Sequence, residues 1–154
     1  VPADICQVLD KALAAYNTMR AVEGRRLAED IAGRLVTIET AVGRVEQQSP
    51  QTVAAYRERL EKKMREVLAS TTMDEGRILT EAAIFADKVA VDEETVRLRS
   101  HVAQLGKDMD FLMQEFNREC NTIGSKCNDL AVTQDVVAMK AEVEKIREQV
   151  QNIE

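Results

Sequence analysis

Apolar residues recur every three or four positions through most of this 154-residue chain, and this spacing constrains the fold more than any other feature. The most regular set keeps its spacing to the C-terminus: Val132, Val136, Met139, Val143, Ile146, Val150 and Ile153. An average interval of 3.5 residues is the spacing of the apolar residues along the contact between helices in a coiled coil or bundle. Aromatic residues are only 3% of the chain and Trp is absent, as expected for such packing. The pattern predicts an all-α protein.

The N-terminal half carries two further sets with the same spacing. They are Ile5, Leu9, Ala12, Tyr16 and Met19, and then Ile31, Leu35, Ile38, Val42 and Val45. The sets are out of register across residues 23–26, which predicts one long helix or two nearly collinear helices over residues 4–47. Ser49 and Pro50 resemble a helix cap and a first-turn proline, so we expect the next helix over residues 50–69. Together these helices would form a long antiparallel hairpin standing out from a smaller bundle.

Three shorter helices are expected downstream. Residues 70–74 resemble a turn and cap before a helix over 74–89. A break at Ala90 and Val91 then precedes a helix from Asp92, whose acidic first turn favours a helix N-terminus. The next helix spans 110–127, and residues 128–132 turn the chain into the final helix. The predicted organisation is a long antiparallel helical hairpin over 1–72 and a helical bundle with coiled-coil-like packing over 73–154.

The predicted helix over 110–127 has an apolar stripe beside an unusual polar face. The stripe consists of Met109, Leu112, Met113, Phe116, Cys120, Ile123 and Cys127. Two polar lines flank it, formed by Asp110, Gln114, Arg118, Asn121 and Ser125, and by Glu115, Glu119, Thr122 and Lys126. Asn, Ser, Thr and Gly lower helix stability because short polar side chains compete for the backbone. Their presence in mid-helix indicates that the polar side chains of this face have a function of their own.

Charge and cysteine content exclude several classes of function. The net charge of −6 does not attract nucleic acid globally, so phosphate binding would need local basic residues or metal ions. Three scattered Cys and a single His do not make a zinc motif. No apolar run approaches the roughly 20 residues that span a bilayer, and no signal peptide is evident. Unpaired cysteines indicate a reducing, cytoplasmic protein.

Candidate chemistry lies on two helix faces. Glu94, Arg97 and His101 share one face, where an Arg and a carboxylate can orient the imidazole. Glu115 and Glu119 are one turn apart, at which spacing two carboxylates can share Mg²⁺ or Mn²⁺. A packed histidine and ordinary surface glutamates explain the same pattern. Because both helices bury an apolar line, we expect Glu94, Arg97 and His101 to meet Glu115, Arg118 and Glu119 along the shared edge.

Longer runs of sequence carry a resemblance to a known family. Residues 94–101, 110–119, 121–129 and 140–154 closely resemble the C-terminal half of the bacterial YicC/YloC family. The resemblance implies a metal-dependent endoribonuclease that acts on single-stranded or small regulatory RNA as a homohexamer. It also implies an N-terminal domain that this chain lacks, and a glycine-containing loop near Gly106. We therefore expect residues to be missing between Leu105 and Gly106.

Under this hypothesis, residue type and helix face suggest the roles. The metal, Mn²⁺ or Mg²⁺, would be held by Glu81, Asp87, Glu94, Glu115 and Glu119. The catalytic residues would be His101, Glu115 and Glu119, with His101 moving a proton to the leaving oxygen. RNA would be bound by Arg97, Arg99, Gln114, Arg118, Asn121, Ser125 and Lys126. The competing hypothesis is a structural helical oligomerisation module without activity, in which the polar face makes hydrogen bonds between helices and subunits.

Overall fold

The computed structural model describes residues 2–67, 74–104, 109–126 and 129–151, and these ranges form helices with short connections. The five helices are α1 (Pro2–Val67), α2 (Glu75–Val89), α3 (Asp92–Ala103), α4 (Met109–Lys126) and α5 (Leu130–Gln151). No strand occurs in these ranges. The expectation of an all-α bundle is confirmed.

Helix α1 is a continuous rod of 66 residues with Pro50 inside it, roughly 100 Å long at 1.5 Å per residue. The predicted break at Ser49 and Pro50 is therefore wrong. Proline in a helix interior removes one hydrogen bond and crowds the preceding turn. Here tertiary packing overrides that local preference, because Val45 is fully buried one turn before Pro50 and Tyr56 stacks on Phe85 of α2 beyond it.

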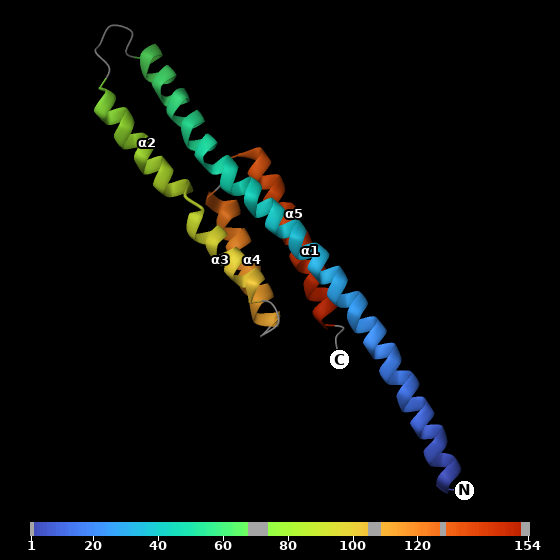
Figure 1. Cartoon of the computed structure of the whole chain (residues 1–154). Coiled ribbons are helices and arrows are strands. Elements are labelled where there is room, and N and C mark those ends of the chain that lie inside the picture. Colours follow the sequence, from blue (N-terminus) through green and yellow to red (C-terminus); the bar gives the residue numbers. More distant parts are fainter. Residues whose placement is uncertain (1, 68–73, 105–108, 127–128, 152–154) are drawn as a thin grey trace.

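The hairpin expected within residues 4–69 is wrong as well, because Pro2–Val67 is one continuous helix. The antiparallel partners of α1 are instead α2 and α3, which run back along it (Figure 1). The Asp74 carboxylate accepts a hydrogen bond from the Arg77 backbone N–H at 3.2 Å, as a helix cap does. Ala90 is extended, with φ −60° and ψ 126°, and separates α2 from α3. The predicted cap and the predicted break at Ala90 are confirmed.

The core lies where α5 packs against α1 and α4 (Figure 1). Most of its buried apolar residues come from the predicted stripes: Ile31, Ile38, Val42, Val45, Leu112, Met113, Phe116, Cys120, Ile123, Val132, Val136, Met139, Val143 and Ile146. Ala41 is buried beside them although it is not part of a predicted stripe. Helices α4 and α5 approach closely at Gly124, where an added Cβ would lie 3.2 Å from Val136 Cγ1. This close approach accounts for a glycine in the last turn of α4.

Helix α5 begins at Leu130, inside the predicted 128–132 turn, because the Asp129 carboxylate caps it. Oδ1 of Asp129 accepts from the Ala131 backbone N–H at 2.8 Å. Residues 127–128 lie outside the described ranges, as does the junction of Leu105 with Gly106. The division of the chain at residue 72 stays a prediction. No helix in the described ranges is apolar and long enough to cross a membrane.

The N-terminal third of α1 extends beyond the other helices (Figure 1). Residues 2–26 are all exposed, whereas the buried side of α1 begins at Ile31. The exposed stretch includes Ile5, Val8, Leu9, Leu13, Tyr16, Met19 and Val22. An apolar stripe of this length on a monomer's surface is the usual mark of a contact with another molecule.

Candidate metal centre at the α3–α4 edge

Helices α3 and α4 pack through apolar residues and so bring their polar edges together. Leu98 of α3 and Phe116 of α4 are fully buried. Arg97, one position before Leu98, lies on the side of α3 that faces α4, where its Nε donates to Glu119 Oε1. The expected meeting with the α4 carboxylates therefore occurs for Arg97 and His101, whereas Glu94 reaches α4 at Lys126.

Three side chains converge closely enough to hold one cation. His101, Glu115 and Glu119 each offer a ligand atom, and these three atoms all lie within 4.8 Å of one another. Glu119 is buried, while Glu115 and His101 are half-buried. Two carboxylates and an imidazole at this separation match the ligand types of a divalent metal site.

His101 has the least satisfied side chain of the three. Its Nδ1 and Nε2 are both enclosed, yet neither has a hydrogen-bond partner among the described residues. The ring packs at a 59° tilt against Phe116, with 6.0 Å between ring centroids. Buried nitrogen atoms in proteins nearly always have a partner, so a cation or water fits beside this ring.

Two arginines balance the carboxylates. Arg97 Nε donates to Glu119 Oε1 at 2.8 Å, and Arg118 Nη2 lies 3.3 Å from the same oxygen. Arg118 also pairs with Glu115 at 2.9 Å. The hydrogen bond to Glu119 raises the pKa of Arg97, against a smaller opposing effect of desolvation. The centre thus contains fixed charge of both signs.

A second group of contacts, made by Lys126, lies beside the joint between α2 and α3. Lys126 Nζ lies 2.7 Å from Glu94 Oε1 and donates to the Ala90 carbonyl at 3.1 Å. Burial acts to raise the pKa of Glu94, but the hydrogen bond from Lys126 and the nearby Arg97 charge outweigh it, so the pKa is lowered. Oε2 of Glu94 is buried and has no hydrogen-bond partner within the part of the chain that the structure describes. The Ala90 carbonyl is a participant that no sequence signal indicated.

Other predicted site residues lie outside this cluster. Glu81 and Asp87 are exposed on α2 and are not among the three converging side chains. Arg99 pairs with Glu46 of α1, with Nη2 and Oε2 2.7 Å apart. Residues on the polar lines of α4 face solvent or other partners: Gln114 is exposed, Asn121 accepts from Lys140 of α5, and Ser125 donates to the Thr122 carbonyl.

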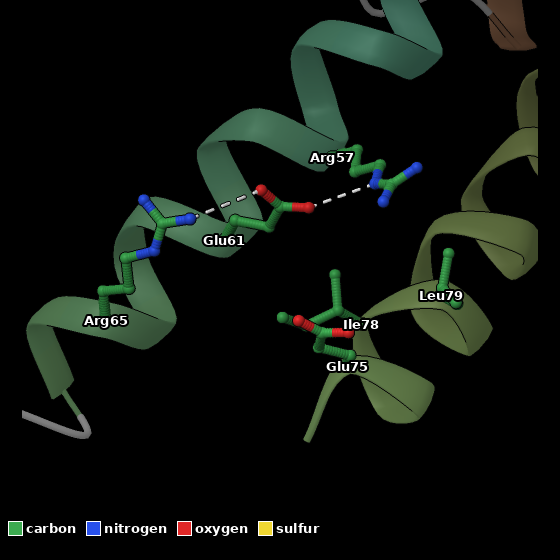
Figure 2. Close-up of a pocket in the computed structure, with 6 residues that line it drawn as sticks. All are labelled: Arg57, Glu61, Arg65, Glu75, Ile78 and Leu79. Carbon is green, nitrogen blue, oxygen red and sulfur yellow. Dashed lines mark hydrogen bonds and ion pairs between the residues drawn. The ribbon is translucent and has the colours of Figure 1, made fainter. Parts of the chain in front are cut away.

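A small cleft of about 140 Å³ between α1 and α2 contains none of the cluster residues (Figure 2). In Figure 2, Glu61 lies between Arg57 and Arg65, with ion-pair distances of 3.1 and 3.9 Å. Glu75, Ile78 and Leu79 of α2 line the opposite side of the cleft.

Comparison with known proteins adds a family relationship. The family model described as endoribonuclease YicC-like, C-terminal, matches residues 45–154. The chain is 45% identical over 159 residues to the probable endoribonuclease YicC of Clostridioides difficile, covering 96% of the chain and 54% of that relative. It is 33% identical over 164 residues to the probable endoribonuclease YicC of Haemophilus influenzae, covering all of the chain and 56% of that relative. The chain spans about half the length of these curated relatives.

Proposed function

This chain belongs to the YicC-like endoribonuclease family, and from that premise we propose that it is the helical part of a metal-dependent endoribonuclease. The reaction is cleavage of RNA phosphodiester bonds. One observation carries the proposal: ligand atoms of His101, Glu115 and Glu119 lie within 4.8 Å of one another at a helix edge.

The residues fit a divalent cation because the His101 nitrogens are enclosed beside two carboxylates and have no hydrogen-bond partner in the described ranges. His101, Glu115 and Glu119 would hold the ion. His101 is then a ligand rather than the proton donor that its sequence context suggested. A bound ion supplies charge neutralisation at the scissile phosphate and activation of water. The imidazole favours Mn²⁺ over Mg²⁺, since Mg²⁺ takes oxygen ligands almost exclusively.

Arg118 is the residue best placed to contact the RNA backbone. Its side chain is 63% exposed while its guanidinium lies beside Glu115 and Glu119. A planar guanidinium matches phosphate oxygens. It therefore supplies the local positive charge that an acidic chain needs. We expect the protein to act in the cytoplasm, where RNA is available and free thiols such as Cys6 and Cys120 stay reduced.

The test is Mn²⁺-dependent cleavage of a labelled single-stranded RNA by the intact protein. Glu119→Gln, Glu115→Gln and His101→Gln should each lower the cleavage rate at saturating RNA by at least about 100-fold, because each removes a proposed ligand. Glu148→Gln on the exposed face of α5 is the matched control and should cut at the wild-type rate. Variants that remain folded and cut like the wild type would defeat the proposal.

The competing structural role has an observation of its own, the exposed apolar stripe of α1 between Ile5 and Val22. We propose that a second copy of the chain covers this stripe, consistent with the 3.5-residue spacing of a coiled-coil seam. The hexamer implied by family resemblance is the expected assembly. Leu9→Asp and Met19→Asp should lower the mass measured by light scattering, whereas Asn17→Asp, off the stripe, should not. An unchanged mass in Leu9→Asp would exclude this contact.

A further inference from the structure

Arg97 is held by carboxylates on two helices. Its Nε donates to Glu119 Oε1 at 2.8 Å across the α3–α4 seam. On its own helix, Nη1 lies 3.4 Å from Glu93 and Nη2 lies 3.6 Å from Glu94. Contacts on three sides fix the orientation of the guanidinium, because a planar fork fits partners only in defined directions.

The Glu94 side of this arrangement is anchored in turn. Glu94 is buried, and Lys126 joins it to the Ala90 carbonyl at the α2–α3 joint. A buried, hydrogen-bonded charge network has little freedom to rearrange. Arg97 is consequently held in place by Glu94, which Lys126 links to α4 and to the α2–α3 joint. Arg97 in turn restricts the orientation of the Glu119 carboxylate.

We propose that Arg97 is a positioning residue of the metal centre, which orients the Glu119 carboxylate for a divalent cation. This inference rests on the proposed function. With Oε1 of Glu119 accepting from Arg97, we expect Oε2 to bind the cation. The role differs from the RNA-phosphate contact expected from sequence, because the Arg97 donors contact protein carboxylates. Arg118 shares Oε1 but is 63% exposed, and so keeps the phosphate-binding role.

Charge and geometry make opposite predictions for this residue, which makes the role testable. Removing the positive charge of Arg97 leaves the centre more negative, and on electrostatic grounds alone a cation should bind more tightly. Loss of a partner that orients a ligand instead weakens metal binding, typically 10–100-fold. The direction of the change in Mn²⁺ affinity therefore separates a positioning role from a simple charge effect.

The experiment measures the Mn²⁺ dissociation constant of the intact protein by EPR detection of free Mn²⁺. Arg97→Lys keeps the charge but loses the fork, and should bind Mn²⁺ about 10-fold more weakly than the wild type. Arg97→Gln should bind at least as weakly, despite its lower charge. Arg99→Gln is the matched control, since Arg99 has a similar exposure on the same helix and pairs with Glu46 instead. The Mn²⁺ dissociation constant of Arg99→Gln should stay within about 2-fold of the wild-type value, a smaller change than the roughly 10–100-fold loss typical for a residue that orients a metal ligand.

Each outcome distinguishes this inference from the proposed function. If Arg97→Lys binds like the wild type, or Arg97→Gln binds more tightly, the positioning role is overturned. Glu119→Gln serves as the reference: if it leaves Mn²⁺ affinity unchanged, the metal centre itself is misassigned. Circular dichroism reports whether each variant folds. Should Arg97→Gln fail to fold, Arg97→Lys alone decides the question.

Discussion

Lys126 Nζ and Glu94 Oε1, 2.7 Å apart, join the last turn of α4 to the first turn of α3. The Glu94 side chain is almost fully buried, while that of Lys126 is one-third exposed. A charge buried to this extent is stable only with its partner in place. This pair therefore sets the spacing of the two helices that carry the candidate metal centre.

Lys126→Met should lower the free energy of unfolding by about 2 kcal/mol, because it leaves the Glu94 carboxylate buried beside Arg97 alone. The figure is smaller than for a wholly buried pair, since water reaches Lys126. Chemical denaturation of the intact protein measures the change. Lys140→Met is the control, because Lys140 is exposed and donates to the exposed Asn121 rather than to a buried carboxylate. Equal free energies of unfolding for the two variants would show that the ion pair between Lys126 and Glu94 does not stabilise the fold more than an exposed contact does.

Acid should weaken the ion pair between Lys126 and Glu94, because it protonates the Glu94 carboxylate. The folded-state pKa of Glu94 is lowered, so the unfolded chain binds more protons in this range and the stabilisation is present only above the unfolded value. As the pH falls below about 4.3, the ordinary value for Glu, this contribution is lost as protonation proceeds. Unfolding free energy measured from pH 7 to pH 3 should fall less steeply in Glu94→Gln. An identical dependence of the unfolding free energy on pH in the wild type and in Glu94→Gln would contradict this role of Glu94.

The continuity of α1 yields a third prediction. If Pro50 lies inside one helix, Pro50→Ala restores a backbone donor and removes a clash, and should raise the free energy of unfolding by about 2 kcal/mol. Pro2→Ala should have little effect, since a proline in the first turn removes no helical hydrogen bond. Thermal unfolding followed by circular dichroism measures both. A loss of stability in Pro50→Ala would instead support a helix boundary at Ser49.

Much of this fold could be predicted from sequence because apolar spacing determines which helix faces are buried. The stripe from Val132 to Ile146 lies in the core, and Asp74 caps α2. The error at Pro50 has a physical cause. A cap signal describes local preference, whereas α1 gains packing on both sides of Pro50, through Val45 and Tyr56, which local sequence does not reveal.

The candidate centre could be predicted only in part. The meeting of His101 with Glu115 and Glu119 followed from two apolar stripes that place neighbouring polar lines at one edge. Helical spacing places Arg97, and not Arg99, on the face of Glu94 and His101, but it does not reveal which carboxylate pairs with each arginine. Two positions in a helix turn the side chain by roughly 200°. Arg99 consequently reaches Glu46 of α1, whereas Arg97 reaches Glu119.

Pulsed EPR of Mn²⁺ bound to the intact protein tests the central claim most directly. If His101 is a ligand beside Glu115 and Glu119, the Mn²⁺ signal should carry nitrogen modulation from the imidazole, and His101→Gln should abolish it. Glu119→Gln should weaken Mn²⁺ binding while any ion that remains bound keeps the nitrogen signal. Bound Mn²⁺ without nitrogen modulation in the wild type, or with modulation that survives His101→Gln, would contradict the proposed metal centre.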